Sequence, residues 1–164
     1  MVAFLASWLF EGPTHVADMY RREDNVSVQW WTATWVPNRR LAGVPVCVLT
    51  AARTQSAAEA LAFHLQQLGR ARVVGERSGG AAHPCRRLPL SDRFAIMLPT
   101  SRAFDPESGR DWEGSGVQPD LETPAGDALR AAHVELLERL AQAPGNAERS
   151  RELHDIAASV KAER

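Results

Sequence analysis

Hydrophobic residues along this chain follow two periods, one typical of strands and one typical of helices. Short apolar runs rich in β-branched residues predict strands, whereas apolar residues spaced three and four positions apart predict amphipathic helices. The predicted strands are His15–Arg22, Val26–Trp35, Val44–Leu49, Ala71–Gly75 and the two arms of a hairpin, Leu88–Leu90 and Phe94–Leu98. The predicted helices are Met1–Phe10, Ser56–Leu68, a helix from near Gly126 to Leu140, and one that contains Leu153–Val160. Strands that alternate with helices indicate an α/β fold.

The remaining segments predict two loops and a division of the chain. Residues 76–85 form a glycine-containing loop, and residues 99–124 are rich in proline, glycine and aspartate. A connection as long as the second one is usually functional in a compact domain. Residues 1–142 are expected to form the main unit, and residues 143–164 a C-terminal helix and tail. The last helix is expected to pack on the surface or on a second subunit, which leaves a homodimer open.

Ser56 lies at the start of a predicted helix, shortly after a predicted buried strand. The first N–H groups of a helix have no partner within it, and the helix dipole favours negative charge there. These conditions suit a serine nucleophile. The same residues also give the pattern Ser56-x-x-Glu59, which is typical of a capping box that only ties down the helix start. Spacing alone favours the capping interpretation.

The composition is that of an ordinary soluble globular protein. Of its 164 residues, 45% are hydrophobic and 24% are charged, and the formal net charge is −1. This charge argues against nucleic acid or an acidic lipid surface as the main partner. No run reaches the roughly 18 apolar residues that span a bilayer, and the first ten residues lack the basic start and the cleavage site of a signal peptide. The residues do not indicate a cellular compartment.

The cysteines and histidines predict no metal site. Cys47 lies in a predicted core strand, where a buried free thiol is the default, and a disulfide with Cys85 stays open. None of the five histidines forms a zinc-binding pattern. His64 falls on the apolar face of its helix and is expected to be a packing residue. We therefore expect no metal and no cofactor.

Several motifs, in order, resemble peptidase family S41, the C-terminal-processing and tail-specific serine proteases. They run from M-V-A-F-L-A-S-W-L-F through V-C-V-L-T, T-Q-S-A-A-E, R-A-R-V-V-G-E and G-G-A-A-H-P to W-E-G-S-G-V-Q-P-D, within about residues 1–133. The resemblance implies the ββα spiral core of the ClpP and crotonase group, and a peptide or protein substrate. It also implies that Ser56 is the nucleophile and that the N–H of Ala57 is one donor to the oxyanion.

The resemblance leaves the general base open. In the best-known branch of the family the base is a lysine in a G-E-x-x-x-G-K motif, and Ala81 stands at that position here. Lys161 is the only lysine of the chain, so a Ser–Lys dyad is ruled out. Another branch uses serine, histidine and glutamate, which makes Glu113 the acid that would orient a histidine, or else an exposed loop carboxylate. His83 is the candidate base within the chain, or a histidine that only bonds within its own loop.

Two parts of the family pattern are missing from these residues. The first helix is not preceded by the D-L-R-x-N-x-G-G segment, which the resemblance implies as the source of the second oxyanion donor. The upstream histidine of the serine–histidine–glutamate branch is missing too. Losing one oxyanion donor typically costs about 10²–10³ in rate. We expect a fragment that begins inside a larger peptidase domain and has little or no peptidase activity alone.

Two other functions stay open. Trp30, Trp31 and Trp35 lie within six residues and could line a groove for a hydrophobic ligand, or form a ladder in a core or interface. The missing lysine and the G-G-A-A-H-P motif favour the branch similar to interphotoreceptor retinoid-binding protein, whose members need not be proteases. Such a module would bind an apolar small molecule. The third alternative is a truncated domain whose exposed surfaces drive dimerisation.

Overall fold

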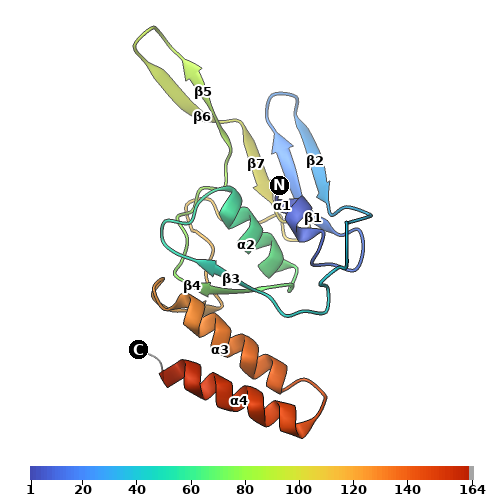
Figure 1. Cartoon of the computed structure of the whole chain (residues 1–164). Coiled ribbons are helices and arrows are strands. Elements are labelled where there is room, and N and C mark those ends of the chain that lie inside the picture. Colours follow the sequence, from blue (N-terminus) through green and yellow to red (C-terminus); the bar gives the residue numbers. More distant parts are fainter. Residues whose placement is uncertain (163–164) are drawn as a thin grey trace.

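Helix α2 (Ala57–Gln67) lies between two sheets in the computed structural model, which describes residues 1–162 (Figure 1). One sheet is antiparallel with the order β2-β1-β7, and the other is parallel with the order β3-β4-β8. The antiparallel strands are β1 (His15–Arg21), β2 (Val26–Trp31) and β7 (Ser101–Phe104). The parallel strands are β3 (Cys47–Thr50), β4 (Arg72–Gly75) and β8 (Leu121–Glu122). The mixture of helices and sheets agrees with the α/β pattern of the sequence.

The main hydrophobic core surrounds α2 because this helix has sheet on two sides. Leu65 of α2 is buried together with Val16 of β1 and Val73 of β4. Gly69 follows the helix with a φ of 62°, the left-handed conformation in which a glycine ends a helix without strain. The helical spacing of apolar residues therefore predicts both the extent of α2 and its position in the core.

The first helix and the second strand are shorter than the sequence predicts, and Arg40 accounts for both corrections. Helix α1 spans only Val2–Ala6, and β2 ends at Trp31. The Arg40 guanidinium donates to the carbonyl oxygens of Ser7 and Phe10 after the helix, and to those of Ala33 and Thr34 after the strand. These carbonyl groups point at one cation, so neither the helix ladder nor the strand ladder continues through them.

Residues 99–124, predicted as one long connection, contain two strands. The first, β7, pairs with β1 along Asp18↔Phe104 to Arg21↔Ser101. The second, β8, pairs with β4 through Leu121. Just before it, the carboxylate of Asp120 accepts a hydrogen bond from the Val73 N–H at 2.7 Å. These pairings join residues far apart in the chain, and a local pattern carries no signal for them.

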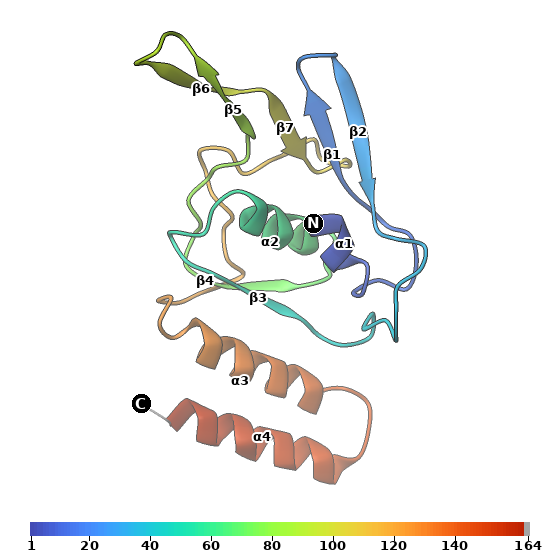
Figure 2. The same cartoon turned by 45° about the horizontal axis from the view of Figure 1, so that its top comes forward.

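The predicted hairpin is present and extends away from the two sheets. Its strands β5 (Cys85–Pro89) and β6 (Ala95–Pro99) pair with each other and project beyond the two sheets (Figures 1 and 2). All residues of both strands are exposed. Cys47 and Cys85 are both free, so the structure does not contain the disulfide that was an alternative from the sequence.

A helical hairpin covers the face of the parallel sheet that is opposite α2 (Figure 2). It consists of α3 (Ala128–Ala141) and α4 (Ala147–Ala162), which starts earlier than the apolar pattern predicts. Val134, Leu137 and Ala157 form a second small core between the two helices. The last two residues of the predicted C-terminal tail, 163–164, lie outside the described residues.

Replacing Gly75 with alanine should destabilise the fold by more than about 3 kcal/mol. Gly75 has a φ of 133°, and a Cβ placed there would lie 2.1 Å from the carbonyl oxygen of Thr50, so both the backbone and the β3–β4 pairing oppose it. The matched control is Gly69→Ala. Gly69 also has a positive φ but has no neighbouring atom within 4 Å, so we expect a cost of only about 1–2 kcal/mol. Urea unfolding of both variants measures the difference, and equal costs would contradict the steric explanation.

Candidate active site

Ser56 stands directly before α2 in a strained backbone conformation. Its φ is 55° and its ψ is −123°, a region that side-chain-bearing residues rarely adopt. The chain reaches it through a tight turn after β3, in which the Ala51 N–H donates to the Thr54 hydroxyl at 3.0 Å. Ser56 is exposed, and the helix starts at Ala57. A strained serine between a buried strand and a helix start is the backbone arrangement on which some hydrolases carry their nucleophile.

Ser56 and Ala57 lie on the wall of a cavity of about 150 Å³ between α2 and the antiparallel sheet. Trp30 of β2 and Trp112 contribute its aromatic surface, and no charged side chain is among the residues that line it. The other lining residues are Met1, Val2, Met19, Ala60, Ala82, Pro84 and Ala103. The cavity can therefore hold an apolar group beside the Ser56 hydroxyl.

The capping box predicted from the sequence is also present. The Glu59 carboxylate accepts a hydrogen bond from the backbone N–H of Ser56 at 2.8 Å. Glu59 is nevertheless fully buried, which is unusual for a residue that only caps a helix. It contacts the loop that follows β4, a role that its position in the sequence does not reveal.

His83 and Glu113, the predicted base and acid, lie next to each other. The Glu113 carboxylate accepts hydrogen bonds from the backbone N–H groups of Ala82 at 2.6 Å and His83 at 2.9 Å. The His83 ring has Nδ1 3.9 Å from Glu113 Oε2, and Nε2 3.6 Å from Asp111 Oδ2. Within residues 1–162, neither side chain forms a hydrogen bond with Ser56, and neither lines its cavity.

Asp111 is the more buried of the two carboxylates beside the His83 ring. Burial acts to raise the pKa of Asp111, but hydrogen bonds from the Arg102 side chain and the Glu113 N–H, with the charges of Arg102 and His83, lower it overall. Asp111 therefore stays ionised and places a negative charge beside the His83 ring. Sequence reasoning passed over Asp111 because its only signal is its place two residues before Glu113.

Ala81, at the position of the family's lysine, lies beside the serine loop. Its backbone N–H donates to Glu59 Oε2 at 2.9 Å, the same oxygen that accepts from the Ser56 N–H. Lys161 is at the end of α4, where it pairs with Glu138. The structure therefore places no lysine side chain near Ser56 within residues 1–162.

The three tryptophans do not share one groove. Trp30 lines the Ser56 cavity, whereas Trp31 stacks on His15 with ring centroids 4.8 Å apart. Trp35 is 74% exposed. Alternation along the strand explains why Trp30 and Trp31 point to opposite faces. Trp112, which sequence reasoning did not single out, takes the place of the other two in the cavity wall.

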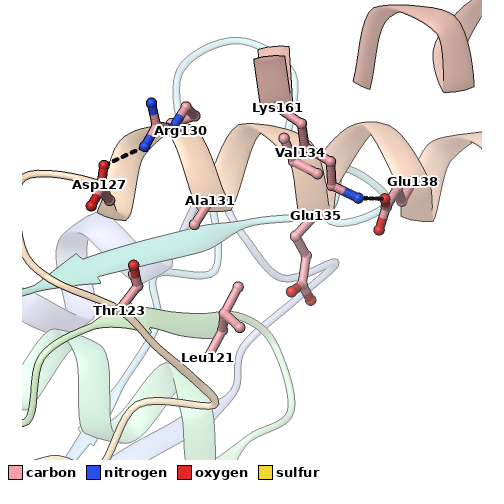
Figure 3. Close-up of a pocket in the computed structure, with 9 residues that line it drawn as sticks. All are labelled: Leu121, Thr123, Asp127, Arg130, Ala131, Val134, Glu135, Glu138 and Lys161. Carbon is pink, nitrogen blue, oxygen red and sulfur yellow. Dashed lines mark hydrogen bonds and ion pairs between the residues drawn. The ribbon is translucent and has the colours of Figure 1, made fainter. Parts of the chain in front are cut away.

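A larger groove of about 460 Å³ lies away from Ser56, between α3, the end of α4 and β8 (Figure 3). Its charged side chains form ion pairs: Asp127 with Arg130, Glu138 with Lys161, and Glu135 with Arg72 of β4. These pairs hold the helical hairpin together and attach it to the parallel sheet, and the groove brings no nucleophile together with a base. The smaller apolar cavity at Ser56 is therefore the better candidate site.

Residues 1–162 contain no group of three or more histidine, cysteine or acidic residues arranged to hold a metal ion. None of the helices among them combines the length and the hydrophobicity that crossing a membrane would require.

The chain is similar to known peptidases. It matches the model of Peptidase family S41 over residues 2–123. A carboxy-terminal-processing protease of Bartonella bacilliformis is 34% identical over 77 residues, which are 47% of this chain and 18% of that protein. The structure of a putative peptidase from Parabacteroides merdae superposes with a TM-score of 0.66 at 19% identity, over 83% of this chain and 47% of its own.

A photosystem II D1 C-terminal processing protease superposes with a TM-score of 0.57 at 22% identity, over 73% of this chain and 30% of its own. The chain therefore spans less than half the length of each of these proteins. At these identities, the structural likeness supports a shared fold.

Proposed function

Because this chain belongs to peptidase family S41, we propose that it is the serine-bearing part of a peptidase that cleaves peptide bonds, with Ser56 as the nucleophile. The observation that carries the proposal is the strained Ser56 at the start of α2, on the wall of an apolar cavity. A functional residue is a common reason for a fold to maintain such strain.

In the proposed reaction, a base removes the Ser56 proton while the oxygen attacks the peptide carbonyl. The N–H of Ala57, at the first position of α2, stabilises the oxyanion together with the helix dipole. His83 is our candidate base, oriented by Glu113, because the two lie side by side. The imidazole has to swing towards Ser56 to accept the proton and then gives it to the leaving amine.

We infer that this machinery is incomplete in the chain alone. No described residue is an evident second oxyanion donor, and no histidine of residues 1–162 contacts Ser56. We propose that residues 1–142 are part of a ClpP/crotonase-like spiral core and that residues 143–164 extend it, with a homodimer through the last helix as one arrangement. We expect little or no cleavage of an unstructured peptide by the purified chain.

Labelling with a fluorophosphonate, which reacts with nucleophilic serines, tests the assignment. We expect slow modification of the intact chain, located at Ser56 by peptide mass spectrometry, and complete loss of that modification in Ser56→Ala. Ser115→Ala is the matched control, since Ser115 is a loop serine outside the cavity and its loss should leave labelling unchanged. Modification spread over several serines at equal rates would refute Ser56 as the nucleophile.

A second function is favoured by the apolar lining of the same cavity. A non-catalytic module similar to interphotoreceptor retinoid-binding protein would hold an apolar small molecule against Trp30 and Trp112. Titration with retinol or a fatty acid should then quench tryptophan fluorescence, and Trp30→Leu should reduce the quenching while Trp35→Leu does not. Quenching without any labelling of Ser56 would favour the carrier over the peptidase.

A further inference from the structure

Glu59 is a buried anion that does more than cap its helix. It lies in the first turn of α2 with no exposed surface, and its carboxylate accepts four hydrogen bonds. Oε2 accepts from the backbone N–H of Ser56 at 2.8 Å and that of Ala81 at 2.9 Å. Oε1 accepts from the Ser78 hydroxyl at 2.5 Å and the Gly80 N–H at 2.6 Å. Three of these four donors belong to the loop after β4.

The network continues to a third segment of the chain. The Ser78 hydroxyl, which donates to Glu59, accepts a hydrogen bond from the Val117 N–H at 2.7 Å. Gly116 packs so closely that a Cβ there would lie 2.2 Å from the Ser78 carbonyl oxygen. Glu59 thus connects the nucleophile, the loop that leads to His83, and the segment that follows Glu113.

Only an ionised carboxylate fits this set of donors. Each oxygen accepts two hydrogen bonds, so an amide nitrogen in either place would face two donors. Burial acts to raise the pKa of Glu59, but hydrogen bonds from Ser78, Gly80, Ala81 and Ser56 outweigh it and lower the pKa. The group is therefore charged at neutral pH, and a helix start is a favourable place for that charge.

We propose that Glu59 is a positioning residue, which holds Ser56 in its strained conformation and keeps the Gly80–His83 loop beside it. This inference rests on the proposed function, because the position matters only if Ser56 reacts. An ordinary capping glutamate contacts its own helix start, whereas Glu59 is bound mainly by another loop. The serine and the loop are therefore fixed relative to each other by one side chain.

The test compares Glu59→Gln with Glu152→Gln, a matched change at an exposed position on α4. At a temperature where circular dichroism shows both variants folded, we expect fluorophosphonate labelling of Ser56 to fall about 10²-fold in Glu59→Gln. Labelling should not change in Glu152→Gln. Glu59→Asp keeps the charge on a shorter side chain and should restore part of the rate. A folded Glu59→Gln variant that is labelled at the wild-type rate would overturn the positioning role.

Two further measurements decide the proposal if Glu59→Gln does not fold or if the wild-type chain is not labelled. If Glu59→Gln does not fold, Ser78→Ala removes one donor and leaves the carboxylate in place, and labelling should still fall with the fold intact. Unchanged labelling in Ser78→Ala would then reject the proposal. If the wild-type chain is not labelled at all, the proposed function fails, and the inference is judged by the scalar coupling between the N–H and Hα of Ser56. That coupling reports φ and should change in a folded Glu59→Gln or Ser78→Ala variant, and an unchanged coupling rejects the positioning role.

Discussion

Replacing Ala81 with lysine should raise the rate at which a fluorophosphonate labels Ser56 by about 10²-fold. The wild-type chain has no lysine side chain near this serine within residues 1–162, and a positioned general base typically contributes about 10²–10⁴ in rate. The resemblance to family S41 aligns Ala81 with the lysine of the Ser–Lys branch. The substitution would thus restore a base at a position where the chain carries a methyl group.

The structure supplies an independent reason to choose this position. The backbone N–H groups of Ala81 and Ser56 donate to the same oxygen of Glu59, at 2.9 and 2.8 Å. Two residues whose N–H groups converge on one atom are close neighbours, so an extended lysine side chain at one can reach the hydroxyl of the other. Ala81 is only half-buried, which leaves room for a longer side chain to emerge.

Ala81→Met is the matched control because it adds a side chain of comparable length without an amine. We expect no increase for methionine. For lysine, labelling should rise with pH, because only the neutral amine can accept the serine proton and the reference pKa of lysine is about 10.4. Equal rates for the two variants would mean that steric changes, and not proton transfer, control the reactivity of Ser56.

The local pattern predicts elements whose signals are local and misses those that depend on distant partners. Helix α2 follows from the spacing of its apolar residues, and the β5–β6 hairpin follows from two apolar arms around a Ser91-Asp92-Arg93 turn. Strand β7 has no such signal, because Ser101–Phe104 becomes a strand by pairing with β1. Arg40 shortens two predicted elements for the same reason, since its contacts form only after the chain has folded.

The candidate site shows the same limit. Ser56 is recognisable as a candidate nucleophile from its position between a predicted strand and a predicted helix. The Ser56-x-x-Glu59 pattern correctly predicts a capping box. The burial of Glu59 and its bonds to Ser78 and Gly80 could not be predicted, because these partners are about twenty residues away in a loop without a regular pattern. The neighbourhood of His83 and Glu113 likewise arises from loop packing, and their catalytic roles stay predictions.

His64 should make the stability of the protein fall by about 3 kcal/mol as the pH decreases from about 6.5 to 4. The side chain has no exposed surface, and neither ring nitrogen has a hydrogen-bond partner among the described residues. It packs edge-on against Phe63 and Trp112, with ring centroids 5.3 and 5.7 Å away. Burial lowers the pKa of His64 from 6.5 to about 4, and the charge of Asp105 opposes this only in part.

The direction of this pH dependence follows from proton binding by His64 in the folded and in the unfolded chain. In the unfolded chain His64 binds a proton below about pH 6.5, whereas the folded protein resists protonation until about pH 4. The stabilisation is therefore complete above pH 6.5 and is lost as the pH falls through this window. Glu59 and Asp111, whose pKa values are lowered by folding, add a loss of the same sign at acidic pH, so total stability alone does not isolate the histidine.

Urea unfolding of the wild type, His64→Leu and His133→Gln between pH 7 and pH 4 isolates the contribution of His64 to stability. His64→Leu removes the titrating group from the core, and its stability should depend on pH less steeply than that of the wild type, by about 3 kcal/mol over the range. His133→Gln is the matched control, because His133 is exposed on α3 and should leave the slope unchanged. Parallel slopes for the wild type and His64→Leu would show that the buried imidazole finds a proton acceptor or water when it is charged. The core between α2 and Trp112, which also forms a wall of the Ser56 cavity, would then be more open than its packing indicates.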